Sequence, residues 1–130
     1  MSKSAISVLV FGIYLAIIGL MLLIVPNLLI VSFGIEPTSE VWIRLSGILL
    51  MAIATYYYLG ARYEIIVIFK ATAFIRSTII FFFSAFALLD MVSPSIIIFS
   101  VIDLIGGLWT FYLLKKEGHF ESTKARLDLT

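Results

Sequence analysis

The sequence predicts an all-α membrane protein: a bundle of four transmembrane helices, with a short interfacial helix after the first span. Its 130 residues are 62% hydrophobic and only 13% charged, with a mean hydropathy of +1.17. A soluble domain is about half apolar and roughly one-quarter charged, so apolar side chains in this excess need lipid around them. Four apolar stretches are long enough to cross a bilayer, and Lys and Arg gather at one side of the predicted bundle.

The first predicted span covers residues 5–25 and stops at Pro26, since roughly 20 apolar helical residues cross a bilayer core. A short N-terminal segment with one lysine, followed by an apolar run, is typical of signal peptides. This run is long enough to span, however, and no small-x-small cleavage site precedes a polar region, so we expect a retained first helix.

The stretch from Leu28 to Ile35 is too short to span a membrane and too apolar for a free loop. We expect a short helix that lies in the membrane interface and ends at Gly34. The alternative is that the first helix kinks at Pro26 and continues outward.

The remaining spans are predicted at residues 41–59, 65–89 and 95–114. Strands are not expected, because no alternation persists and open sheet edges do not occur in lipid. The sequence therefore predicts a four-helix transmembrane domain over residues 1–116 and a polar cytoplasmic tail over residues 117–130.

The distribution of Lys and Arg predicts the orientation, because cytoplasmic connections are enriched in these residues. Outside the spans, Lys and Arg lie before the first span, between the second and third spans, and after the fourth span. The charged residues of the other two connections are all acidic. We therefore expect a multi-pass protein of the inner (plasma) membrane with both termini in the cytoplasm. The basic residues concerned are Lys3, Arg62, Lys115, Lys116, Lys124 and Arg126.

Composition argues against several classes of function. The formal net charge is +1, which favours neither nucleic acid nor an acidic partner. The chain has no Cys, so disulfides, thiolate metal sites and a cysteine nucleophile are excluded. Its one histidine, His119, lies in the tail without metal-ligating companions, and we expect no metal or other cofactor.

Ionisable side chains within predicted spans are the best candidates for a functional site. Each costs about 2.5–3.5 kcal/mol at mid-bilayer, so it is expected to face the bundle interior, to pair, or to reach the interface. Arg76 and Asp103 lie near the middle of their spans, and Arg44 lies in the outer half of its span. Lys70 lies about one turn from the inner surface and is expected to extend toward it.

The charged faces of the second, third and fourth spans also carry hydroxyl side chains at three- or four-residue helical spacing. We therefore predict a polar core that either binds a ligand or fixes the bundle. Its six members are Arg44, Thr55, Thr72, Arg76, Ser100 and Asp103.

Two interpretations of these charges stay open. In the first, Arg76 and Asp103 form a salt bridge that fixes helix register, while Arg44 reaches outward to Glu40 or to a lipid phosphate. In the second, two inward arginines face one carboxylate. The surplus guanidinium, in a cavity open toward the outer leaflet, would then bind an anionic or carbonyl-bearing ligand.

Three motifs resemble a known family. They are Trp42-Ile43-Arg44-Leu45-Ser46-Gly47, Gly60-Ala61-Arg62, and Asp103-Leu104-Ile105-Gly106-Gly107-Leu108-Trp109 together with the third-span arginine. Over residues 5–116 the chain is similar to the DoxX-like superfamily of small four-helix bacterial membrane proteins, in its BphX-like or uncharacterised branch.

This resemblance implies a four-helix bundle whose polar residues match Arg44, Arg76 and Asp103. Some DoxX-like relatives are linked to quinone-dependent redox complexes. This chain has no Cys, no histidine within a span and no flavin or haem motif, so a redox function does not transfer with the fold.

The sequence favours a non-enzymatic function: binding of a small amphipathic or anionic molecule in the polar-lined bundle, or service as an accessory subunit of a membrane complex. The first alternative is an intramembrane enzyme, an isomerase or a quinone-linked enzyme, that uses Asp103 with Arg76 or Arg44. The second is a small anion or drug transporter that needs oligomerisation. The expected partners are membrane lipid, a small hydrophobic or anionic ligand, and further copies of the chain or a membrane complex.

Overall fold

The computed structural model describes residues 1–120, and these residues form helices joined by short connections. Four of the helices are long and apolar enough to cross a membrane. The four predicted spans are therefore confirmed as helices, and most of the predicted tail lies outside the described residues. The elements are α1 (Lys3–Ile24), α2 (Pro26–Ser32), α3 (Val41–Arg62), α4 (Ile66–Leu88), η1 (Pro94–Ile96) and α5 (Ile97–Lys116).

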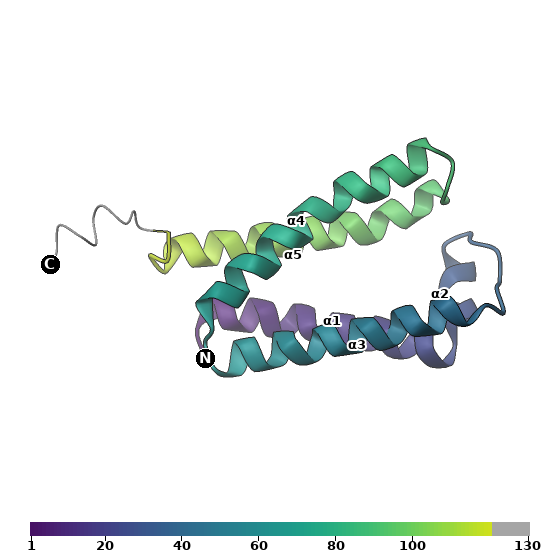
Figure 1. Ribbon diagram of the computed structural model, residues 1–130. Helices are drawn as coiled ribbons and strands as arrows, with labels where there is room; N and C mark the ends of the chain where they lie inside the picture. The colour runs from purple at the N-terminus through teal and green to yellow at the C-terminus, as the bar shows by residue number, and fades with distance from the viewer. Residues whose placement is uncertain (121–130) are drawn as a thin grey trace, which may run out of the picture.

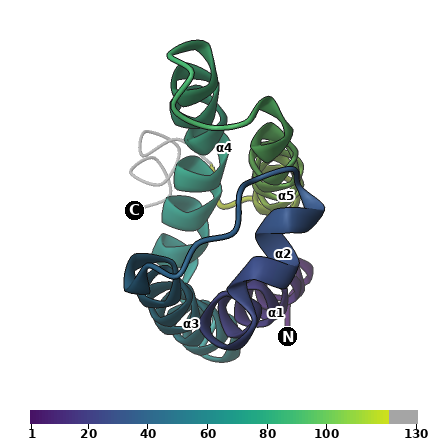
Figure 2. The same ribbon diagram turned by 90° about the vertical axis from the view of Figure 1, so that its right-hand side faces the viewer.

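The long helices pair as two hairpins rather than as one evenly packed bundle. Helix α1 packs along α3, and α4 packs along α5, whereas contacts between the two pairs are few. Figure 1 shows that the hairpins meet near the N-terminus and diverge toward the opposite end, which Figure 2 views end-on. Residues that join the hairpins are therefore expected near the end that holds the N-terminus.

Glycines allow the helices of each hairpin to approach closely. A Cβ atom on Gly47 of α3 would lie 2.5 Å from the carbonyl oxygen of Gly19 and 2.7 Å from the amide nitrogen of Leu23, both in α1. In the other hairpin, a Cβ atom on Gly107 would lie 2.6 Å from the Oγ of Ser77. Small residues at helix contacts are the usual means of packing apolar helices tightly.

The first helix ends because Pro26 has no backbone N–H with which to continue the hydrogen-bond ladder. Val25, between the helices, has a φ of −130° and a ψ of 58°, so α2 is a separate helix rather than a kinked continuation of α1. After α2 the chain turns at Gly34, whose φ of +74° suits glycine. A short helix after the first span is confirmed, although it covers Pro26–Ser32 rather than the predicted stretch from Leu28 to Gly34. Its position in a membrane interface stays a prediction.

The end of α2 connects the two hairpins where they diverge. The ring of Phe33 lies 4.4 Å from the ring of Phe99 in α5, measured between centroids. The hydroxyl of Ser95 in η1 donates a hydrogen bond to the carbonyl oxygen of Phe33. Figure 2 shows α2 between α1 and α5, so this segment links the hairpins on that side.

The charges are separated along the molecule as the sequence predicts. Of the six basic residues predicted to lie in the cytoplasm, the four that the structure describes belong to the end where the N-terminus lies: Lys3, Arg62, Lys115 and Lys116. The connections at the opposite end carry Glu36, Glu40 and Asp90 instead.

Candidate functional site

Arg76 lies in the middle of α4, where the two hairpins meet, and its side chain is only 1% exposed. Its Nε donates to the carbonyl oxygen of Thr72 at 3.2 Å. Its Nη2 donates to the Oγ1 of Thr110 in α5 at 2.9 Å and lies 3.5 Å from the Oγ1 of Thr72. Its Nη1 is buried and has no hydrogen-bond partner among the described residues.

Two aromatic rings cover the guanidinium group. Its central carbon lies 4.5 Å from the ring centroid of Phe11 in α1 and 5.6 Å from that of Tyr57 in α3. A guanidinium within about 6 Å of a ring centroid is attracted to the electron-rich face of the ring. Because Thr110 comes from α5, all four long helices contribute to the surroundings of Arg76.

Gly106 makes room for this arrangement on α5. A Cβ atom at this position would lie 2.8 Å from the ring of Phe11 and 3.2 Å from Nη1 of Arg76. The unpartnered nitrogen therefore lies against α5 at Gly106, and Asp103 lies on the same face of that helix, three residues earlier.

Asp103 is half-buried and makes no hydrogen bond or ion pair with Arg76 among the described residues. The physical reason is the direction in which helical side chains lean, which is toward the N-terminus of their own helix. Arg76 therefore reaches back to Thr72, toward the start of α4. The same tendency directs the side chain of Asp103 toward the start of the antiparallel α5, at the opposite end. The direct salt bridge considered from the sequence does not form here.

Arg44 lies away from Arg76 and has a different set of contacts. Its exposed guanidinium donates through Nη1 to the carbonyl oxygens of Leu23 and Ile24, the last residues of α1. Carbonyls in the last turn of a helix have no partner within the helix, and Pro26 provides no N–H for them. Arg44 therefore caps α1 and reaches neither Glu40 nor the buried arginine.

The predicted hydroxyl residues separate into three environments. Thr72 is buried and contacts Arg76, as predicted for the polar core. Ser100 is also buried, one turn from Asp103, and donates to the carbonyl oxygen of Ile97. Thr55 is exposed on α3, where it donates to the carbonyl oxygen of Met51.

The polar network continues through residues that were not among the predicted six. The Oγ1 of Thr110 and the Oγ of Ser7 lie 2.9 Å apart, and Ser7 donates to the carbonyl oxygen of Ser4 at 2.6 Å. The signal in the sequence is weak: Ser4 and Ser7 are three residues apart, as two residues on one helix face are. Their importance depends on α5 packing against α1, which a single sequence does not reveal.

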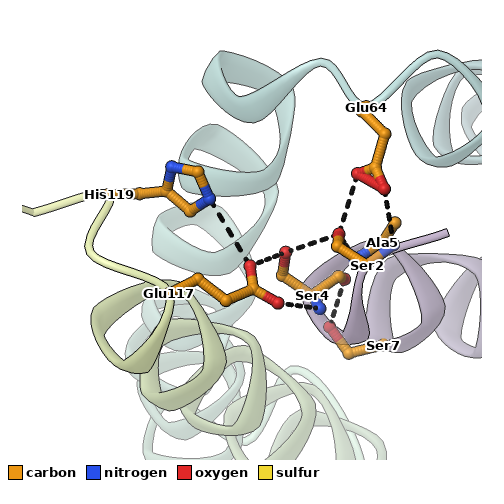
Figure 3. Close-up of polar contacts among 7 residues, drawn as sticks. All are labelled: Ser2, Ser4, Ala5, Ser7, Glu64, Glu117 and His119. Atoms are coloured by element: carbon orange, nitrogen blue, oxygen red, sulfur yellow. Dashed lines mark hydrogen bonds and ion pairs between the residues drawn. The ribbon is translucent and has the colours of Figure 1, made fainter.

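The N-terminus of α1 is held by two carboxylates from other parts of the chain (Figure 3). Glu117, at the end of α5, accepts a hydrogen bond from the Ser4 amide at 3.1 Å and a second bond from the Ser4 hydroxyl. Glu64, in the turn between α3 and α4, accepts from the amide of Ser2 and, at 2.8 Å, from its hydroxyl. Both acids satisfy N–H groups that the first turn of a helix leaves unpaired and interact favourably with its dipole.

The pKa of Glu117 reflects these contacts. Partial burial by itself raises the pKa of this carboxyl group, but the hydrogen bonds from Ser4 and the nearby His119 outweigh it and hold the pKa below its ordinary value of 4.5. The Nε2 of His119 lies 3.5 Å from the Oε2 of Glu117. The first residues of the predicted tail thus fold back onto the helices.

Comparison of the chain with protein-family models, with characterised proteins and with solved structures finds no match. Within residues 1–120, no group of three His, Asp or Glu side chains is placed to hold a metal ion. The geometry around Arg76 and Asp103 is therefore the basis of the functional argument.

Proposed function

We propose that this chain is an integral membrane protein, with both termini in the cytoplasm, that binds a small amphipathic molecule through Arg76. Four long apolar helices and the gathering of basic residues at one end support the membrane location and its orientation. The three motifs that resemble the DoxX-like superfamily support membership of that superfamily. They also suit an alternative function, that of an accessory subunit of a membrane complex.

The observation that carries the proposal is the buried Nη1 of Arg76, which has no partner among the described residues. An unsatisfied buried donor costs about 1–3 kcal/mol, and more when it is charged. A ligand oxygen that accepts from Nη1 would recover this free energy. The group that fits is a carboxylate or a carbonyl, since both present an acceptor and no competing positive charge.

The shape of the molecule indicates where the rest of the ligand would lie. The hairpins diverge toward the end opposite the N-terminus (Figure 1), and the long helices present mainly apolar side chains. A polar headgroup on Arg76 would therefore leave its apolar tail pointing along the diverging helices, toward the outer leaflet. This arrangement suits a molecule with one small acceptor group and one hydrocarbon tail.

A thermal unfolding assay of the full chain in mild detergent tests this function. The probes are decanoate and a decyl-substituted benzoquinone, with decyltrimethylammonium as a control that has the same tail and the opposite charge. We expect decanoate or the quinone to raise the unfolding temperature of the unmodified chain. Arg76→Gln should weaken that binding by a factor of about 10 to 150, because a hydrogen bond to a charged group contributes roughly 1.5–3 kcal/mol.

Arg44→Gln is the matched control, since Arg44 caps α1 and does not contact Arg76. It should lower the unfolding temperature without changing the affinity for either probe. Equal affinity in Arg76→Gln and the unmodified chain would contradict the proposal. An increase in unfolding temperature with decyltrimethylammonium as large as that with decanoate would also contradict the proposal.

A second candidate function is proton transfer on a bound carbonyl compound, because Asp103 has no ion pair with Arg76 and so is not held by it. Nη1 of Arg76 would stabilise the developing oxyanion while the Asp103 carboxyl moves the proton. Exchange of the α-hydrogens of decan-2-one for deuterium, followed by mass spectrometry, tests this idea. If Asp103→Asn exchanges as fast as the unmodified chain, this candidate is excluded.

A further inference from the structure

A second site lies on the α1–α3 hairpin, separate from Arg76. It is a groove of about 540 Å³ between the two helices. Ile13 and Ile48 at its edges are 53% and 51% exposed, so the groove opens outward. Its lining is apolar apart from two hydroxyl groups and consists of Leu9, Gly12, Ile13, Ala16, Ile48, Met51, Ala52, Ala54, Thr55 and Tyr58.

The groove runs along the half of the hairpin nearest the N-terminus. On α3 its lining residues follow one helical row, and the same row continues to Arg62, four residues after Tyr58. From position 48 to position 62 the helix rises about 21 Å at 1.5 Å per residue. Half of a bilayer core is about 15 Å thick, so this row extends from near mid-membrane to the surface. One acyl chain of a phospholipid occupies the same depth.

The cationic side chain of Arg62 lies at the end of this groove. Nη1 of Arg62 donates to the phenol oxygen of Tyr58 at 2.9 Å, which holds the guanidinium next to a groove residue. Arg62 has no ion pair among the described residues, because the nearby carboxylate of Glu64 is bonded to Ser2 instead. The guanidinium is exposed and also lies 5.8 Å from the ring centroid of Tyr63. A phosphate matches guanidinium in charge and geometry.

We propose that this groove binds one acyl chain of an anionic phospholipid of the cytoplasmic leaflet, with the lipid phosphate on Arg62. The apolar row that ends in a cation is complementary to a hydrocarbon chain that ends in a phosphate. The proposal rests on the proposed membrane orientation, but not on the ligand site at Arg76.

The charge also argues against a second copy of the chain as occupant. A symmetric dimer with parallel chains through this groove would bring the two Arg62 side chains toward each other, because the same surface is used by both subunits. Like charges at such an interface oppose association. A phosphate neutralises Arg62, whereas a second copy does not.

Native mass spectrometry of the detergent-purified full chain tests the proposal. The probes are phosphatidylglycerol and phosphatidylcholine with identical acyl chains. We expect one phosphatidylglycerol molecule to bind per chain at about one-tenth of the concentration that phosphatidylcholine requires. Arg62→Gln should abolish this preference, and Ala52→Trp, which fills the groove from an exposed position, should weaken binding of both lipids.

Three variants provide matched controls. Lys116→Gln removes an exposed cation at the same end of the molecule, and Ala71→Trp adds the same bulk to an exposed position on α4. Both should retain the preference for phosphatidylglycerol. Arg76→Gln should retain it too, so failure of the ligand proposal and failure of this one can be told apart.

The proposal is overturned if the two phospholipids bind the unmodified chain equally, or if Ala71→Trp weakens binding as much as Ala52→Trp. Because the chain has no native Cys, Ala52→Cys gives a further readout. Efficient disulfide cross-linking of Ala52→Cys chains in membranes would show that a second copy fills the groove, and would also overturn the proposal.

Discussion

The guanidinium of Arg76 is surrounded by neutral partners: a backbone carbonyl, a threonine hydroxyl and two aromatic rings. Thr110 is the partner that joins this group to another hairpin, because it accepts from Arg76 and also lies within hydrogen-bond distance of Ser7. Its side chain is completely buried. One hydroxyl group therefore takes part in hydrogen bonds to both α4 and α1.

Thr110→Val tests this role, since valine keeps the shape of threonine and removes the hydroxyl. The change removes the shorter of the two hydrogen bonds that Nη2 of Arg76 makes, at 2.9 Å, and leaves only the longer one to Thr72. We therefore expect a loss of about 1–3 kcal/mol in the free energy of unfolding. Unfolding of the purified chain in detergent, followed by circular dichroism, measures it. Thr55→Val, at an exposed threonine, is the control, and equal losses in the two variants would argue against the role of Thr110.

For single residues, the sequence predicted well which side chains face the bundle interior. It predicted less well which side chains contact one another. The cost of an unshielded charge in lipid indicates that Arg76 and Asp103 turn inward. Helical spacing assigns each to a face, but not the direction in which its side chain leans along the helix. That direction separates Arg76 from Asp103 and brings it to Thr110 instead.

The helices of the α1–α3 hairpin are in contact at Gly47, where backbone atoms of α1 occupy the space that a side chain would take. Gly47→Ala would place its Cβ atom 2.5 Å from the carbonyl oxygen of Gly19, which cannot rotate away as a side chain could. Overpacking of this kind costs about 1–3 kcal/mol. We expect a clearly lower unfolding temperature for Gly47→Ala in detergent.

Ser46→Ala is the control for this substitution because Ser46 is the exposed neighbour of Gly47 on the same helix. It should leave the unfolding temperature nearly unchanged. If Gly47→Ala is as stable as Ser46→Ala, the helices do not approach as closely as described.

The elements themselves were largely predictable. Apolar length located the four long helices, and Gly34 marked the turn that follows the short helix α2. The pairing of α1 with α3 was not predictable, because it depends on contacts between residues far apart in the chain. The same holds for the capping of α1 by Arg44, which was predicted to belong to the polar core.

For the whole molecule, the carboxylates at the N-terminus of α1 tie the two hairpins together. Glu117 extends from α5 to Ser4, and its pKa is lower in the folded chain than the ordinary 4.5. A carboxyl group whose pKa is lower in the folded chain than in the unfolded chain contributes its full stabilisation at pH values above its pKa in the unfolded chain. This contribution is lost as the pH falls through the folded value.

We therefore predict that Glu117→Gln lowers the unfolding temperature at neutral pH, and that its difference from the unmodified chain shrinks as the pH falls below the ordinary value of 4.5. Thermal unfolding in detergent over this pH range is the measurement. Glu36→Gln, at an exposed residue at the opposite end, is the control and should leave the unfolding temperature at neutral pH nearly unchanged. A difference for Glu117→Gln that is the same at every pH would contradict this role.

The arrangement of the whole molecule combines predicted and unforeseen features. The separation of basic and acidic ends follows from the positions of Lys and Arg in the sequence. The divergence of the hairpins does not follow from it, because hydropathy records how apolar a helix is and not which neighbour it packs against. The groove on the α1–α3 hairpin was missed for the same reason.

The central claim is that the four long helices cross the membrane with both termini in the cytoplasm, and cysteine labelling tests it most directly. Single cysteines are introduced as Ser39→Cys, between α2 and α3, and as Lys116→Cys, at the end of α5. A membrane-impermeant maleimide is added to intact cells and, separately, to permeabilised cells. We predict that Ser39→Cys is labelled in intact cells and that Lys116→Cys is labelled only after permeabilisation. Recovery of the chain in the soluble fraction, or labelling of Lys116→Cys in intact cells, would contradict the account.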